Sequence, residues 1–330
     1  MVHSSNRRAW VHGIGLVVLL ALPIIAEALN DPFWITIATR MLIYGLAAMS
    51  LDLILGYGAM VSFGHAAFFG LGAYTVGILT HHVFYAEAIP FLPGHWEGSS
   101  QALVQWPLAM VVSGFFALVI GVLSLRTQGV YFIMITLAFA QMVYFFMIGL
   151  PTYGGEDGLN VWMRSEVPGM NLSDPWQFYY LVLALLLLWL AFSQRLVQSR
   201  FGRVLAGCRQ NSERMHTLGY PVRRYQLTAF VIAGMGAGLA GALAANQNEF
   251  ASPGLMAWST SGELMVMVIL GGMGTLVGPI LGAIVLLTLE EILSGLTEHW
   301  MVVLGPILVL VVLFARGGLY RLLIGGRHDD

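Results

Sequence analysis

The chain alternates between long apolar runs and short polar segments from one end to the other. The apolar runs lie at residues 10–29, 33–55, 59–80, 103–125, 129–150, 176–192, 225–246, 262–274, 275–293 and 300–315. A run of about 20 apolar residues is long enough to cross a bilayer as a helix. The pattern therefore predicts an all-α polytopic membrane protein. We expect about ten transmembrane helices, eight at the least, in a single membrane domain over residues 1–330.

Glycine interrupts this pattern in two places. Gly56-Tyr-Gly58-Ala-Met-Val61 is repeated loosely as Gly272-Met-Gly274-Thr-Leu-Val277. Interrupted helices at corresponding positions are typical of transporters built from inverted repeats, where they often lie near the substrate path. We therefore expect a broken helix within residues 262–293 and an inverted-repeat core. Two alternatives remain: the glycines serve only close helix packing, or residues 262–274 form a re-entrant half-helix, which would change the number of crossings.

The positive charges are segregated to one set of loops. All 15 basic residues are arginines, and on the ten-span arrangement thirteen of them fall on one side, with Arg40 and Arg164 as the exceptions. Because arginine-rich loops stay in the cytoplasm, we expect both termini and residues 193–224, here called the basic segment, to be cytoplasmic. The loops at 81–102 and 151–175 are expected outside, in the periplasm. As an alternative for the first run, residues 1–28 form a signal peptide cleaved near residues 26–28.

Composition excludes several classes of protein. With 58% hydrophobic and 10% charged residues, the chain is not a soluble globular domain. Without lysine it lacks the Walker A residue that contacts ATP phosphates. A single cysteine, Cys208, excludes an internal disulfide framework, and His81, His82 and His95 in one external loop have no partner at a metal-ligand spacing. We expect no catalytic residue, metal site or cofactor in this chain itself.

Residues 51–74 carry the most specific motif of the chain. They read Leu51-Asp-Leu-Ile-Leu-Gly-Tyr-Gly-Ala-Met-Val-Ser-Phe-Gly-His-Ala-Ala-Phe-Phe-Gly-Leu-Gly-Ala-Tyr74. This stretch resembles the signature of the LivM-type permease subunits of branched-chain amino-acid ABC importers. Further similar stretches follow at residues 128–132, 137–142, 154–159, 201–203, 218–219, 225–242 and 268–279, in the order expected for the family.

The resemblance implies partners and a location. Such a permease pairs with a second permease subunit, two cytoplasmic ATPase subunits that bind ATP and Mg²⁺, and a periplasmic substrate-binding protein. The family is found in the bacterial inner membrane, and nothing in it implies binding to nucleic acid. Its cargoes include branched-chain amino acids, other amino acids and urea-like amides, so a urea- or amide-type permease stays open as an alternative.

The same resemblance gives the basic segment a role. In the family this segment contains a short coupling helix that sits in a groove of the ATPase. The residues assigned to this contact are Arg203, Arg209, Asn211, Glu213, Arg214, Leu218 and Gly219. Gln210 and Ser212 stand where the family has acids, and Arg214 and Met215 stand where it has alanines, so we expect a changed fit.

Gly219 predicts the end of this coupling helix in the left-handed conformation, with Pro221 preventing its continuation. The alternative for the whole segment is a solvated basic loop held near anionic lipid.

Polar residues inside the apolar runs are candidates for the substrate path. They are Ser62, His65, Gln128, Tyr131, Thr136 and Gln141. We expect most of them to be satisfied contacts between helices, because an unpaired polar group is costly inside a membrane.

The ionisable residues inside the runs support a rival hypothesis, an ion-coupled secondary transporter. They are Arg40, Asp52, Glu263, Glu290 and Glu291, and such groups often form proton relays. This hypothesis leaves the basic segment unexplained. A channel is less favoured still, because the sequence contains no filter-like carbonyl repeat and no Asn-Pro pore pair.

Overall fold

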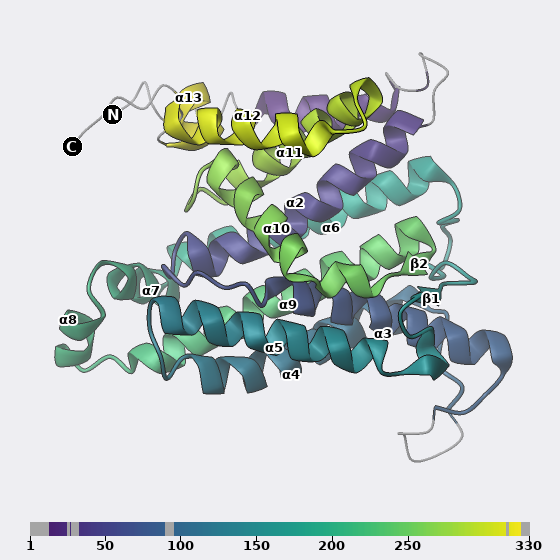
Figure 1. Ribbon diagram of the computed structural model, residues 1–330, viewed down its shortest axis with the longest axis horizontal. Coiled ribbons are helices and arrows are strands. Elements are labelled where there is room, and N and C mark those ends of the chain that lie inside the picture. The colour runs from purple at the N-terminus through teal and green to yellow at the C-terminus, as the bar shows by residue number, and fades with distance from the viewer. Residues whose placement is uncertain (1–12, 25–26, 28–32, 90–95, 315–316, 325–330) are drawn as a thin grey trace.

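The computed structural model describes the chain except for residues 1–12, 25–26, 28–32, 90–95, 315–316 and 325–330. Within the described residues, seven helices are long and apolar enough to cross a membrane: α2 (Phe33–Leu55), α3 (His65–Tyr85), α4 (Ala102–Ser124), α5 (Val130–Ile148), α6 (Pro175–Gln198), α9 (Val222–Asn248) and α11 (Gly278–Leu296). Shorter apolar helices are Gly13–Ile24, α10 (Trp258–Gly271) and α12 (Trp300–Phe314). Each expected apolar run coincides with one of these helices, which confirms the all-α polytopic architecture (Figure 1).

The first expected run, residues 10–29, is described over only part of its length. The possible cleavage motif at residues 26–28 lies largely outside the described residues.

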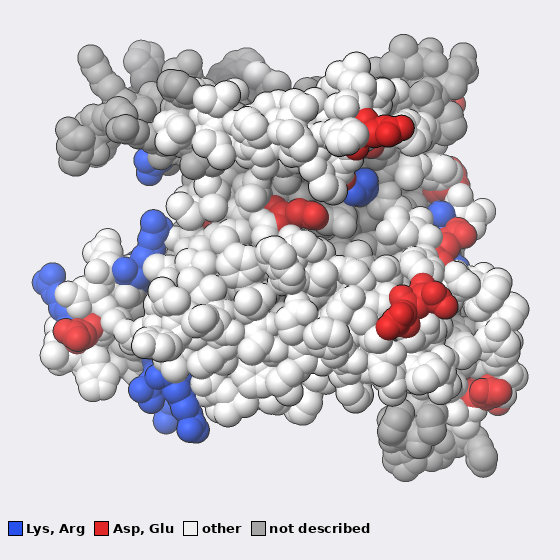
Figure 2. Space-filling view, in the orientation of Figure 1, with Lys and Arg blue, Asp and Glu red and all other residues white. Residues whose placement is uncertain are grey.

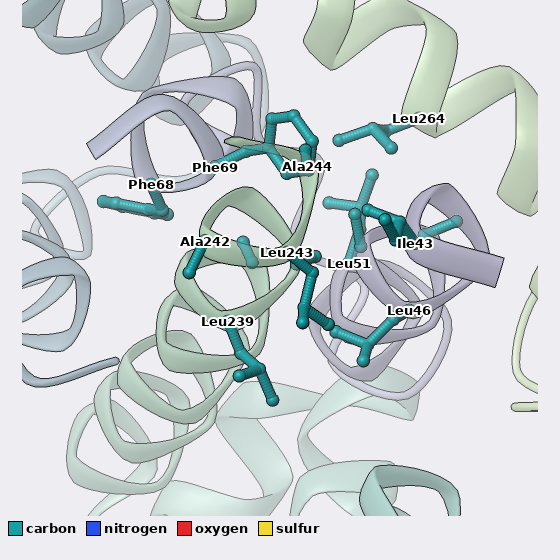
Figure 3. Packing of buried hydrophobic residues seen from close by; sticks show 14 of the residues in the cluster. Ile43, Leu46, Leu51, Phe68, Phe69, Leu239, Ala242, Leu243, Ala244 and Leu264 are labelled. Carbon is teal, nitrogen blue, oxygen red and sulfur yellow. The ribbon is translucent and has the colours of Figure 1, made fainter. Parts of the chain in front are cut away.

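Three helices, α2, α3 and α9, form the centre of the bundle. Most of their residues are buried, whereas α5 and α6 leave most of theirs accessible. Side chains such as Leu46 of α2, Phe69 of α3 and Leu243 of α9 meet in one apolar cluster (Figure 3). On α5 the exposed side chains are large and apolar, Tyr131, Met134, Met142, Phe145 and Phe146 among them. Such a face suits lipid or another membrane subunit.

Glycines let the central helices approach closely. A Cβ atom at Gly72 of α3 would lie 2.0 Å from the carbonyl oxygen of Gly238 of α9. A Cβ atom at Gly241 would lie 1.7 Å from the carbonyl oxygen of Phe69. Because only glycine permits such backbone contact, these glycines let α3 and α9 pack closely.

Two expected helix starts are wrong. The third helix is expected from residue 59, but α3 begins at His65. Ala59 has φ +53°, a left-handed conformation that interrupts a right-handed helix. The first piece of the broken helix is expected from residue 262, but α10 begins at Trp258. A short 3-10 turn ends at Ala257, whose backbone is extended, and the helix starts at the next residue.

The break inside residues 262–293 is confirmed. Helix α10 ends at Gly271 and α11 begins at Gly278. Between them Gly272 and Gly274 have φ values of +118° and +75°, which only glycine adopts without strain.

The polar segments fold at the two ends of the bundle. The basic segment contains α7 (Arg200–Gln210) and α8 (Ser212–Thr217). The opposite end holds η1 (Pro151–Tyr153) and two short antiparallel strands, β1 (Leu159–Asn160) and β2 (Phe250–Ala251). Between β2 and α10, η2 (Pro253–Met256) packs inside the bundle, with Met256 buried beside Gly70 of α3. The last described helix is α13 (Gly318–Ile324). Figure 1 shows α7 and α8 at one end of the long axis and the two strands near the other.

The contact between α4 and α9 predicts the effect of a small substitution. In Gly238→Ala the new Cβ atom would lie 2.3 Å from Oγ of Ser113 and 2.9 Å from the carbonyl oxygen of Ala109. We expect this overpacking to reduce the stability of the protein by about 1–3 kcal/mol. The yield of monodisperse protein in gel filtration should fall, and the melting temperature of that protein should fall as well. The control is Gly262→Ala, where no atom lies within 4 Å of the new Cβ atom. Equal behaviour of the two variants would contradict the packing role.

Candidate functional site

Helix α8 has a side-chain cap at its start and a left-handed glycine after its end. The Asn211 side chain caps its start, with Oδ1 accepting a hydrogen bond from the Arg214 backbone N–H at 2.9 Å. At its other end Gly219 has φ +87°, and its N–H donates to the His216 carbonyl at 3.0 Å. The predicted left-handed glycine is therefore confirmed, and α9 starts directly after Pro221.

The residues assigned to the coupling contact share one property: all of them are exposed. They are Arg203, Arg209, Asn211, Glu213, Arg214, Leu218 and Gly219. Leu218 exposes 64% of its surface and Tyr220 exposes 41%, so two large apolar side chains stand at the end of α8 among the arginines. In Figure 2 basic side chains gather at this end of the molecule, and acidic side chains are common toward the opposite end. An exposed mixture of arginine and apolar groups has the composition of a protein-binding surface.

Met215 faces the other way. Its side chain packs beside Gly207 of α7, where a Cβ atom would lie 2.8 Å from the Met215 sulfur. It also borders a small buried cluster of Val204, Cys208 and Val222. Of the two residues that stand where the family has alanines, Arg214 is therefore exposed, whereas Met215 joins α8 to α7.

Arg209 reaches from α7 into the membrane helices. Its Nη1 donates a hydrogen bond to the carbonyl oxygen of Gly56, in the non-helical segment between α2 and α3. The same nitrogen lies beside Gly274, in the break between α10 and α11. Sequence reasoning assigned Arg209 only to an external partner and missed this internal contact. A guanidinium has several N–H donors, so it can serve both contacts.

The two glycine breaks lie against each other. A Cβ atom at Gly56 would lie 2.3 Å from the backbone nitrogen of Gly274. The loosely repeated motifs of the sequence therefore come together in space. Both interruptions leave backbone groups without helical partners, and inside a membrane these groups must be satisfied by protein.

Asp52 satisfies part of this requirement. It is fully buried on α2. Its Oδ1 accepts a hydrogen bond from the Gly274 N–H at 2.7 Å, and its Oδ2 accepts one from the Leu276 N–H at 3.2 Å. Asp52 thus holds the α10–α11 break against the end of α2. The signal for this role in the sequence is a carboxylate placed one turn before a glycine-rich break.

The ionisable residues of the rival hypothesis do not form one relay. Arg40 of α2 and Glu290 of α11 form an ion pair at 3.5 Å, and Glu263 of α10 lies within electrostatic range of both. Asp52 lies about 18 Å farther along α2, at 1.5 Å per residue, and its bonds go to backbone N–H groups. A chain of titratable groups through the membrane is not assembled among the described residues.

Three of the expected path residues gather near the start of α3. Ser62 and His65 are fully buried there, and the Ser62 hydroxyl accepts a hydrogen bond from the Gly64 N–H at 3.2 Å. Nε2 of His65 lies 3.1 Å from the Ser50 hydroxyl. Thr136 of α5 lies beside Gly64, and its hydroxyl donates to the Ile133 carbonyl at 3.0 Å. Of these bonds, only the one between His65 and Ser50 joins two helices, and Nδ1 of His65 is buried without a hydrogen-bond partner.

The other expected path residues are dispersed. Tyr131 points away from the bundle with 73% of its surface exposed, and Gln141 is half-buried on α5. Gln128 alone among the six lines a cavity of about 230 Å³ between the non-helical segment, the start of α5 and the basic segment. Cys208 and Gln226 also line this cavity, and burial raises the pKa of the Cys208 thiol, which keeps it protonated.

Comparisons with known proteins agree with the sequence motif. Residues 33–312 match the family model of the branched-chain amino acid transport system permease component. The chain is 28% identical over 328 residues to the high-affinity branched-chain amino acid transport system permease protein LivM of Escherichia coli K12, covering 92% of this chain and 74% of the relative. It is 29% identical over 330 residues to the protein of the same name from Salmonella typhimurium LT2, covering 91% and 74%. No solved structure matches.

Proposed function

Since this chain belongs to the family of branched-chain amino acid transport system permease components, we propose that ATP hydrolysis in separate subunits drives it through the basic segment. The chain is a permease subunit of an ABC importer and is not itself an enzyme. Its relatives are named for branched-chain amino acids, and a branched-chain or related amino acid is the proposed cargo.

The observation that carries the proposal is the hydrogen bond from Arg209 to Gly56. It joins a helix outside the membrane bundle to the point where two membrane helices are interrupted. A displacement of α7 by a partner would therefore act directly on the end of α2 and on the α10–α11 break. Broken helices are suited to this task because packed elements switch between discrete arrangements at such points.

The exposed face of α7 and α8 is the proposed docking surface for the ATPase. Arg203, Arg209 and Arg214 would meet acidic groups of the partner, and Leu218 would fill an apolar pocket. ATP and Mg²⁺ would bind in the partner, because this chain has no lysine for a Walker A loop. A second permease, a second ATPase and a periplasmic binding protein would complete the importer.

The proposed location is the bacterial inner membrane with the basic segment in the cytoplasm. The distribution of arginine supports this orientation. Among the described residues, Arg40 and Arg164 are the two arginines that do not lie on the same side of the bundle as α7 and α8. Arginine-rich loops remain on the cytoplasmic side during insertion. Both termini would then be cytoplasmic.

Coupling is tested by Gly219→Val. A β-branched residue at φ +87° is strained by about 1–2 kcal/mol, so the end of α8 should move. We expect severalfold less co-purification of the ATPase and less binding-protein-stimulated ATP hydrolysis in reconstituted membranes, with normal insertion. Arg214→Glu should weaken the same association through charge repulsion.

A matched control for Gly219→Val is available at the other end of the bundle. Gly169 has φ +82°, and like Gly219 it has no atom within 4 Å of a Cβ position. Gly169→Val should strain the backbone equally and leave ATPase association intact. Normal association and normal stimulated hydrolysis in both Gly219→Val and Arg214→Glu would refute the coupling role and favour a lipid-facing basic loop.

Orientation is tested by labelling with a thiol reagent that does not cross membranes. In a Cys208→Ser background the chain has no cysteine, and single Glu→Cys changes can be made at the exposed Glu97, Glu156 and Glu213. We expect labelling from the periplasmic side at positions 97 and 156, and protection at position 213 until the membrane is opened. Labelling of position 213 from outside would overturn the orientation.

A further inference from the structure

Helix α2 is buried along almost its whole length, with one polar exception. Apart from Phe33 and Trp34 at its start, its only residues that are not buried are Thr36, Arg40 and Tyr44. These residues are four positions apart, so they lie on one face of the helix, one above the other. The most enclosed span of the protein therefore leaves open a single stripe, and every side chain in that stripe is polar.

Two neighbouring helices place acidic groups opposite this stripe. Glu290 of α11 lies 3.5 Å from Arg40, and the two side chains keep 28% and 43% of their surface exposed. Glu263 of α10 is exposed and lies within electrostatic range of both. Figure 2 shows acidic and basic side chains together in a hollow in the middle of this face of the molecule.

The stripe is fixed in place and closed at one end. The Arg40 guanidinium lies over the Tyr44 ring, 5.7 Å from its centre, and the Tyr44 ring packs against Phe69 at 5.5 Å. One residue farther on, a Cβ atom at Gly45 would lie 3.5 Å from Ile280, so α2 and α11 are in contact there. The polar stripe is thus open toward the end of the bundle opposite α7 and α8, and it stops at this contact.

Partly exposed charges at this depth need an explanation. Arg40 lies about 10 Å into α2, at 1.5 Å per residue, within a helix of membrane-spanning length. Charged groups facing hydrocarbon are costly, and those that occur inside membrane proteins face a water-filled cavity, a partner or a ligand. Internal pairing of Arg40 with Glu290 leaves Glu263 as an additional negative charge.

From this arrangement we infer that Thr36, Arg40, Tyr44, Glu263 and Glu290 form a binding site for the charged ends of a free amino acid. Arg40 would bind the α-carboxylate as a charge-assisted hydrogen-bond donor, and Glu263 and Glu290 would bind the α-ammonium group. A zwitterion brings one charge of each sign, so it can enter between Arg40 and Glu290 and satisfy both. The inference rests on the proposed function and adds to it the groups by which this chain recognises its substrate.

The test measures binding to the assembled importer in nanodiscs without the binding protein, by saturation-transfer NMR, which detects weak ligands. Three probes share one apolar skeleton: leucine, 4-methylpentanoate, which lacks the ammonium group, and 3-methylbutylamine, which lacks the carboxylate. The variants are Arg40→Gln, Glu263→Gln and Glu290→Gln. Arg164→Gln is the control, because it removes an exposed ion pair with Glu249 outside the site.

The expected pattern is reciprocal. Arg40→Gln should weaken the binding of leucine and of 4-methylpentanoate about tenfold, as expected for losing a hydrogen bond to a charged group. The affinity for 3-methylbutylamine should change less than about twofold. The two Glu→Gln variants should bind leucine and 3-methylbutylamine more weakly and bind 4-methylpentanoate as the wild type does. The control should bind all three probes as the wild type does. A purely structural ion pair would not produce opposite preferences for the two probes.

Several outcomes would overturn the inference. One is absence of leucine binding to the wild type, and another is equal loss of all three probes in every variant. A third is loss of the second permease subunit with unchanged binding, which would make the cluster a subunit interface. If the importer carrying Arg40→Gln does not assemble, the binding pattern of Glu263→Gln, a change at an exposed residue, decides whether the inference holds. ATP-dependent uptake of leucine by the wild-type importer is measured separately, in sealed proteoliposomes with the binding protein. Its failure would refute the proposed function itself, whereas normal uptake without the expected binding pattern would refute only the inference.

Discussion

The carboxylate of Asp52 holds together the two places where membrane helices are interrupted. Between α10 and α11 the backbone turns through glycines with positive φ, so the N–H groups of Gly274 and Leu276 have no helical partners. Asp52 accepts hydrogen bonds from Gly274 and Leu276, and no lipid could replace them. The same contact requires glycine at position 56, where the two breaks approach most closely. A buried carboxylate thus satisfies backbone groups of this irregular segment that would be costly to leave unpaired.

Helix α2 connects the parts of the molecule that matter for transport. Near one end it carries Asp52 and leads to Gly56, which Arg209 of the basic segment contacts. Near its other end it carries the polar stripe of Arg40 and Tyr44 opposite Glu290. Between these ends its side chains are buried against α6, α9, α10 and α11. Because packed cores shift between discrete arrangements rather than bend gradually, a movement of α7 would reach the stripe through a rigid helix.

The sequence predicts the helices of this fold well, because apolar run length decides them and the membrane leaves few alternatives. It also predicts the left-handed Gly219 and the glycine break before α11, since glycine has a conformational freedom that other residues lack. It misplaces the start of α3, because the residues from Ala59 to Gly64 are as apolar as a helix and only their backbone conformation differs. The sequence signals the role of Asp52 only by its place one turn before Gly56. It does not give the partners of Asp52 and Arg209, because these are backbone groups far away in the chain. The orientation of Met215 toward α7 could not be predicted, because residue type alone does not define the orientation of a helix as short as α8.

The central claim, that Asp52 holds the α10–α11 break in place, is tested most directly by hydrogen exchange of backbone amides in Asp52→Asn. Asparagine keeps one acceptor oxygen but presents an NH₂ group to the other backbone N–H, which should cost about 1.5–3 kcal/mol. The account predicts at least about tenfold faster exchange in peptides covering residues 272–277, and unchanged protection where α3 packs on α9. Unchanged exchange at residues 272–277 would contradict it.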